Sequence, residues 1–210
     1  MADALPLAIP AGLPRPIRGY IRSIDAMNRF IGRVAMYMIF VLIGILLWSS
    51  FSKTFLTPTL WTLEMAQFVM VAYYILGGPY SIQLGSNVRM DLFYGGWSVR
   101  QKAWFDSITV FFLMFYLGVL FYGGLGSLSY SLGYFGLEPL EFFWQLAVAF
   151  FTGGPEAAGE ILGFLERSST AWRPYLWPIK TLLVLGVLLM LLQALAELFR
   201  DIGRIRGGEV

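Results

Sequence analysis

The sequence predicts an all-α integral membrane protein with four transmembrane helices, an N-terminal amphipathic interfacial helix and an extended loop between the third and fourth helices. First, 58% of the 210 residues are hydrophobic and 13% are charged, whereas about a quarter of the residues of a soluble domain are charged. Second, the apolar residues form long blocks, as membrane-spanning helices require. Third, Lys and Arg gather near both chain ends and around residues 85–103, which indicates a fixed orientation in a membrane.

The chain has no cysteine and no histidine, which excludes several kinds of site. Disulfides and thiolate chemistry need cysteine, and histidine is the commonest metal ligand and the usual general base. We find no phosphate-binding loop, no metal-ligand cluster and no nucleophile paired with a base. The sequence therefore predicts a protein that is not an enzyme and holds no cofactor. Its net charge of +2 is too small to suggest a nucleic-acid partner.

The N-terminal region divides into two segments. Residues 1–16 contain four prolines and are expected to be flexible. Because basic residues follow the apolar start instead of preceding it, we expect no cleaved secretory signal. Residues 17–206 are expected to form a single membrane domain.

Residues 17–33 have the pattern of a basic amphipathic helix at a membrane surface. One face carries residues spaced three or four apart, namely Ile17, Ile21, Ile24, Asn28 and Ile31. Another face carries Arg18, Arg22, Asp25, Arg29 and Arg33. The alternative is a solvated helix end that leads into the first span. Both interpretations place five arginines, with Arg15 as the fifth, on one side of the membrane.

Four apolar blocks are long enough to cross a bilayer as helices. They lie at about residues 34–52, 65–88, 107–137 and 177–199. The third is longer than a bilayer requires, so we expect it to tilt or project. Small residues four apart give this helix a face that another helix, of this chain or of a partner, could approach closely; they are Gly123, Ser127 and Ser131.

The loop at residues 138–175 is acidic. Its apolar run at 142–152 is too short to span a membrane, so we expect a re-entrant or interfacial segment, followed by a short acidic helix near 156–166. Because basic segments remain in the cytoplasm, the four spans place both termini in the cytoplasm and this loop outside.

Two charged residues at the outer membrane boundary are candidate interface residues. Glu64 lies in the first turn of the second span, where a carboxylate interacts favourably with the helix dipole. It is either an ion or proton site or a boundary carboxylate that caps the helix or pairs across the bundle. Lys180 lies in the first turn of the fourth span, where the dipole disfavours a cation. We therefore predict that Lys180 pairs with an acid, either Glu64 or one in the 138–166 segment, or binds a lipid phosphate.

The remaining candidates flank or interrupt the spans. Arg89 and Asp91 either anchor and cap the cytoplasmic exit of the second span or fix the following loop against a partner. The Gly77-Gly78-Pro79 sequence predicts a break in this span, for helix packing or for an ion site. Trp177 is one of six tryptophans near the predicted span ends, which is typical of an interfacial belt.

Five short sequence motifs lie within about residues 25–200, and their order along the chain is informative. They are Trp61-Thr62-Leu63-Glu64, Gly77-Gly78-Pro79-Tyr80, Asn87-Val88-Arg89-Met90-Asp91-Leu92, Trp177-Pro178-Ile179-Lys180 and Leu191-Leu192-Gln193-Ala194-Leu195-Ala196-Glu197. With this order and the four-span layout, the chain resembles the DctQ-like small membrane (permease) subunit of tripartite ATP-independent periplasmic (TRAP) transporters. It departs from the family at Pro79, where alanine is frequent, and at Asn87, where histidine is frequent.

The resemblance implies partners and a location. The partners are a large multi-span transport subunit, which binds substrate and the coupling ion, usually Na⁺, and a periplasmic substrate-binding protein, with membrane lipids around the complex. It implies symport of an organic acid or a similar solute across a bacterial inner membrane, with the small subunit as a scaffold. The alternatives are a self-sufficient transporter that acts as a homo-oligomer, in which Glu64 and Lys180 would line a path, and a membrane-embedded enzyme.

Overall fold

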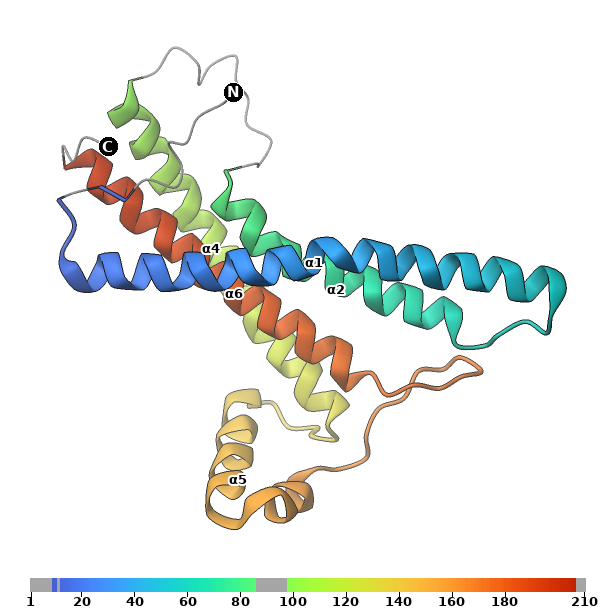
Figure 1. The fold of residues 1–210 in the computed structure, drawn as a ribbon. Helices are drawn as coiled ribbons and strands as arrows, with labels where there is room; N and C mark the ends of the chain where they lie inside the picture. Colours follow the sequence, from blue (N-terminus) through green and yellow to red (C-terminus); the bar gives the residue numbers. More distant parts are fainter. Residues whose placement is uncertain (1–8, 11, 86–97, 207–210) are drawn as a thin grey trace. The chain divides into compact units, whose positions relative to one another are not determined.

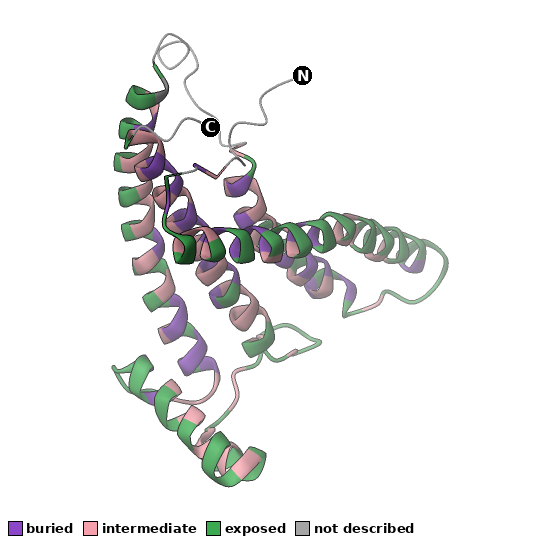
Figure 2. Cartoon of the chain, turned by 60° about the vertical axis from the view of Figure 1, so that its left-hand side comes forward, coloured by how far each residue is buried: buried purple, intermediate pink, exposed green. Residues whose placement is uncertain are grey.

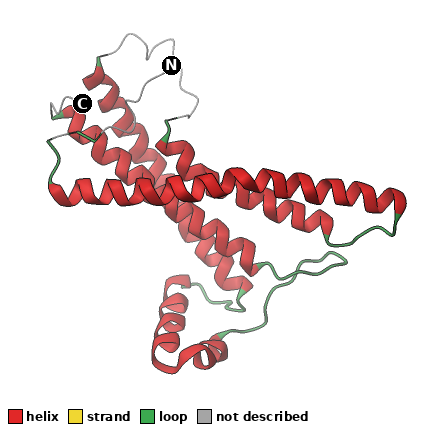
Figure 3. Cartoon of the chain, in the orientation of Figure 1, coloured by secondary structure: helices red, strands yellow, loops and turns green. Residues whose placement is uncertain are grey.

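The computed structural model describes residues 9–10, 12–85 and 98–206. This part of the chain is all-helical and contains no β-strand (Figures 1 and 3), which confirms the predicted class. The helices are α1 (Arg15–Phe55), α2 (Thr62–Gln83), α4 (Val99–Ser131), α5 (Pro139–Ile161) and α6 (Trp177–Ile205).

Three of the described helices, α1, α4 and α6, are long and apolar enough to cross a membrane. These correspond to the first, third and fourth predicted spans. The second predicted span, residues 65–88, falls on α2, which ends at Gln83 and carries Glu64 in its first turn. Residues 86–88 lie outside the described part, and a membrane crossing by α2 stays a prediction.

Helix α1 joins two segments that the sequence analysis separates. It runs without interruption through 41 residues and contains both the predicted amphipathic helix and the first span. Pro16 is tolerated because it lies in the first turn, where the backbone N–H has no acceptor within the helix. The predicted amphipathic helix therefore does not end before the first span but continues into it without a break. Its position at the membrane surface stays a prediction.

Capping interactions fix both ends of α4. At its start, the Ser98 backbone N–H donates to Gln101 Oε1 at 3.0 Å and the Gln101 N–H donates to Ser98 Oγ at 3.4 Å, which is a capping box. At its end, the Gly133 N–H donates to the Tyr130 carbonyl and the Tyr134 N–H to the Ser129 carbonyl. With Gly133 at φ 89°, this is a Schellman motif. The predicted continuation of the third span to residue 137 is therefore wrong.

Helix α5 occupies much of the predicted loop at 138–175. Pro139 stands at its N-terminus, and Gly154 interrupts it with φ 74°. A short helical piece then continues to Ile161. A short acidic helix is thus present near its predicted place, but it ends before the predicted limit of residue 166.

The chain divides into two compact units. The first comprises Met1–Tyr37, Tyr74–Gly118 and Gly186–Val210, and the second comprises Met38–Tyr73 and Val119–Leu185. Each unit contains a core cluster of buried apolar residues. The cluster comprises Leu13, Ile21 and Ala196 in the first unit, and Leu125, Leu128 and Val184 in the second. Away from these clusters, exposed side chains occupy most of the second half of α1 (Figure 2), many of them large and apolar.

Candidate functional site

In the second unit, Lys180 has the acidic partner that its position predicts. Its Nζ lies 2.6 Å from Oε2 of Glu166 and also donates to the Ser127 carbonyl at 3.3 Å. Ser131 Oγ donates to the same Glu166 oxygen. Burial alone would raise the pKa of Glu166, but the hydrogen bonds from Lys180 and Ser131 and the positive charge of Lys180 together hold this pKa below its usual value. The predicted ion pair of Lys180 is confirmed.

Glu64 lies in the same unit and is almost fully buried, with 4% of its surface exposed. It accepts a 2.7 Å hydrogen bond from Ser168 Oγ and a second one from Thr170 Oγ1. Its other carboxylate oxygen, Oε2, is buried without a hydrogen-bond partner among the described residues. Glu64 thus holds a returning loop against the start of α2, and a role in partner binding stays a prediction.

The loop between Glu166 and Leu176 is a tight hairpin. Its backbone hydrogen bonds run from the Ser168 N–H to the Pro174 carbonyl, 2.9 Å, and from the Leu176 N–H to the Glu166 carbonyl, 3.2 Å. The Arg167 guanidinium lies 4.4 Å from the centre of the Tyr175 ring. Because Lys180 holds one end and Glu64 holds the Ser168–Thr170 segment, this hairpin is fixed at two places.

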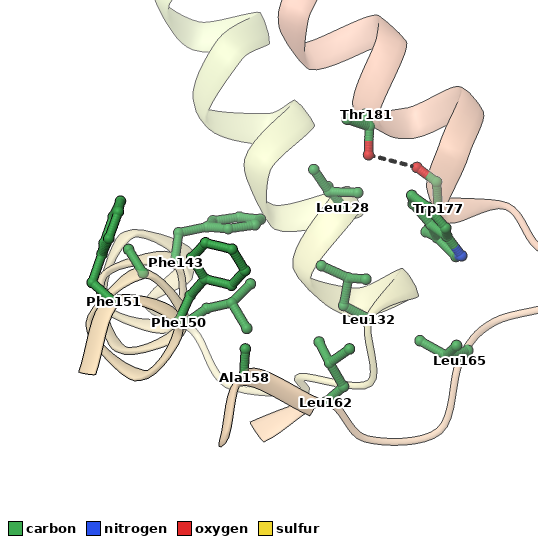
Figure 4. Close-up of a pocket in the computed structure, with 12 residues that line it drawn as sticks. Leu128, Leu132, Phe143, Phe150, Phe151, Ala158, Leu162, Leu165, Trp177 and Thr181 are labelled. Carbon is green, nitrogen blue, oxygen red and sulfur yellow. Dashed lines mark hydrogen bonds between the residues drawn. The ribbon is translucent and has the colours of Figure 1, made fainter. Parts of the chain in front are cut away.

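An apolar cavity of about 640 Å³ lies beside this hairpin in the second unit. Figure 4 shows its walls. Leu128 comes from α4 and Leu132 from the turn that follows it, Phe143, Phe150 and Phe151 come from α5, and Trp177 and Thr181 come from α6. The hydroxyl of Thr181 is bound to the Trp177 carbonyl at 2.8 Å, so it offers the cavity no free donor. Trp177 therefore lines an apolar cavity, and its role at an interface stays a prediction.

The Gly77-Gly78-Pro79 sequence lies in the first unit, and the predicted break is wrong. Helix α2 continues through all three residues to Gln83. Pro79 leaves the Ile75 carbonyl without its helical donor, and α6 approaches this carbonyl closely: a Cβ on Gly186 would lie 3.2 Å from the Ile75 oxygen. Gly78 also lies close to α6, since a Cβ there would lie 2.9 Å from the Met190 sulfur. This close approach of α6 favours helix packing, one of the two alternatives.

A buried polar cluster in the first unit is absent from the predicted set. Arg200, fully buried, pairs with both Asp25 and Glu197. Gln193 Nε2 donates to Asp25 Oδ1 at 3.3 Å and to Glu197 Oε1 at 3.0 Å. Asn28 Nδ2 donates to Gln193 Oε1 at 2.7 Å. The signal in the sequence was Asn28, a polar residue on the apolar face of an amphipathic helix.

The remaining candidates, Arg89 and Asp91, lie outside the described residues. Within the part of the chain that the structure describes, no group of three or more acidic side chains could hold a metal ion. The arrangements that the structure brings together among the described candidates are ion pairs and hydrogen bonds between helices and loops.

Comparison with known proteins identifies a family for this chain. The family model of the DctQ component of tripartite ATP-independent periplasmic transporters matches residues 42–152. The match begins within α1 and ends within α5. No curated protein and no solved structure matches the chain. Since the family model covers more than half of the sequence, this chain belongs to the DctQ family of TRAP transporter components.

Proposed function

We propose that this protein is the scaffold subunit of a binding-protein-dependent secondary transporter. It anchors the static part of a large multi-span subunit in a bacterial inner membrane, with both termini in the cytoplasm. The large subunit carries an organic acid or a similar solute together with a coupling ion, for which Na⁺ is the first candidate. A periplasmic binding protein delivers the solute.

The family match carries this proposal, because a DctQ component is part of a transporter and not an enzyme. The chemistry of the described helices supports the scaffold role in particular. Charged groups inside the first unit pair with one another, as Arg200 does with Asp25 and Glu197. A substrate path would instead need charged groups that are not paired with one another and can bind a passing solute.

Exposed aromatic side chains support a role in the membrane beside another protein. On α4, within the first unit, Phe111, Phe112 and Phe115 are each about two-thirds exposed. Apolar surface of this extent is typical of helices that contact lipid or a neighbouring subunit. We infer that the chain presents these residues to hydrocarbon or to the large subunit.

Reconstitution tests the proposal. Proteoliposomes that contain this chain with the large subunit, supplied with the binding protein and an inward Na⁺ gradient, should accumulate the solute. Proteoliposomes that contain this chain alone should not. Solute uptake by the chain alone would contradict the scaffold role and favour the homo-oligomeric transporter. Failure of the two membrane subunits to co-purify in detergent would contradict the partnership itself.

A further inference from the structure

Three arginines surround a hollow on the first turns of α1, in the first unit. Arg15, Arg18 and Arg22 line a pocket of about 310 Å³ together with Gly19. In a helix with 100° between residues, these positions lie within about one quarter to one third of the circumference. Gly19 leaves the floor of the hollow open, since a Cβ placed there would meet nothing within 4 Å.

The three guanidinium groups have no hydrogen bond or ion pair with any residue that the structure describes. The acid nearest to them along the helix, Asp25, is buried and bound to Arg200. Two arginines of α6 in the same unit are paired, Arg200 with Glu197 and Arg204 with Asp201. The hollow therefore concentrates three positive charges with no negative group of the described chain to neutralise them.

A phosphate group fits this arrangement. Guanidinium groups bind phosphate oxygens through paired, charge-assisted hydrogen bonds, and an open pocket among three of them allows contact from several sides. The Arg18 backbone N–H is not available to such a phosphate, because it already donates to the Pro14 carbonyl. The groups that the hollow offers to a phosphate are the three guanidinium groups, around the space that Gly19 leaves.

The same helix indicates where such a phosphate is found. Arg29 and Arg33 continue the basic stripe, and both are exposed. Close to them, Phe30 and Tyr37 are 70% and 69% exposed, as expected for residues that contact hydrocarbon. Basic residues next to a membrane-spanning segment lie in the region of lipid headgroups, where anionic lipids attract them.

We propose that Arg15, Arg18 and Arg22 form a binding site for a phosphate group around Gly19, of the kind that an anionic phospholipid headgroup or a free phosphate ion provides. This site is independent of the transport partners. It differs from general attraction between a basic helix and a negative surface, because it requires the hollow as well as the charge.

The purified full chain in neutral detergent tests the site. Phosphatidylglycerol, phosphatidylcholine or inorganic phosphate is added, and the shift in unfolding temperature is measured against concentration. Phosphatidylglycerol should stabilise the chain saturably and phosphatidylcholine should not. If inorganic phosphate gives an equal shift, the ligand is the free ion. If neither phosphatidylglycerol nor inorganic phosphate gives a shift, the site does not exist.

Two variants separate the hollow from the charge. Gly19→Leu fills the hollow and keeps every arginine, and Arg18→Gln removes one charge from its wall. Each should weaken the apparent affinity by about fivefold or more. Arg33→Gln, which removes the same charge from the stripe outside the hollow, should retain nearly all of the affinity. Equal losses in Arg18→Gln and Arg33→Gln, with none in Gly19→Leu, would show general electrostatic attraction and overturn the proposal.

Discussion

At the residue scale, the ion pair between Lys180 and Glu166 makes stability depend on pH. The pKa of Glu166 in the folded chain lies below its usual value, as described above, while the unfolded chain has a glutamate pKa of about 4.3. The unfolded state therefore binds the proton more readily. The contribution of Glu166 to stability is fully present above the unfolded pKa and is lost as the pH falls through the folded pKa.

We therefore expect Glu166→Gln to lower the unfolding temperature at pH 7 by a small amount, corresponding to about 0.5–1 kcal/mol for a partly exposed pair. The difference between wild type and variant should disappear progressively below about pH 4.3. Thermal unfolding in detergent between pH 3 and pH 7 measures it. Glu160→Gln, on an exposed glutamate, is the control. A difference that stays constant down to pH 3 would contradict the assignment.

The sequence could predict that Lys180 needs an acid, but not which one. A cation in the first turn of a helix opposes the helix dipole, and this is visible without a structure. The choice of Glu166 depends on the hairpin that returns the chain to α6, which is a tertiary feature. For the same reason Asn28 could be recognised as a polar residue on an apolar face, whereas its partner Gln193 lies 165 residues away.

At the scale of elements, helix positions were predictable and several helix ends were not. Long apolar blocks predicted the end of α1 and the start of α6 to within a few residues, whereas the predicted third span missed both ends of α4 by six residues or more. Composition also remained apolar beyond Ser131, so the third span was extended too far. The end of α4 is fixed instead by hydrogen bonds around Gly133, whose left-handed conformation the apolar pattern does not reveal.

Gly154 is a second such position, and it gives a prediction for α5. Its φ of 74° is a conformation that residues with a side chain adopt only with strain. Gly154→Ala should destabilise the bend between the two parts of α5 by about 1 kcal/mol. Gly159→Ala should be neutral or slightly stabilising, because no positive φ is found there and a Cβ would meet nothing within 4 Å.

Hydrogen exchange in detergent measures this difference. Amides of residues 156–161 should exchange faster in Gly154→Ala than in wild type, and no faster in Gly159→Ala. Phe150 precedes Gly154 in the chain, Ala158 and Leu162 follow it, and all three line the same cavity. If the bend is destabilised, the amide of Leu162 should therefore also exchange faster. Equal exchange in the two variants would show that the bend can form without a glycine.

At the scale of the whole molecule, membrane residence and family followed from the sequence because they depend on composition and on motif order. The polar contacts inside the protein could not be predicted from the sequence in this way. The middle of each apolar block carries no charged residue, yet Arg200 near the end of α6 is fully buried. A buried arginine at a helix end is indistinguishable in sequence from an exposed one that anchors the helix to the membrane surface.

The cluster around Arg200 connects three helices of the first unit, and it should be essential for their packing. Asp25 belongs to α1, and Glu197 and Arg200 belong to α6. Gln83 of α2 donates to the Asp25 carbonyl at 3.2 Å. Arg200→Met leaves two carboxylates without their cation, and loss of one partner of a buried ion pair costs about 3–5 kcal/mol. We expect a large fall in the unfolding midpoint of the full chain in detergent.

The triple variant Asp25→Leu/Glu197→Gln/Arg200→Met distinguishes pairing from a general need for polar groups. It removes the unpaired charges together with the arginine, and apolar replacement of a complete buried ion pair is frequently neutral. Its midpoint should therefore lie well above that of Arg200→Met. Arg29→Met, which removes the same charge from an exposed position of α1, should change the midpoint by less than about 0.5 kcal/mol. If the triple variant is no more stable than Arg200→Met, the loss comes from the volume and hydrogen bonds of Arg200 and not from the carboxylates that it leaves unpaired.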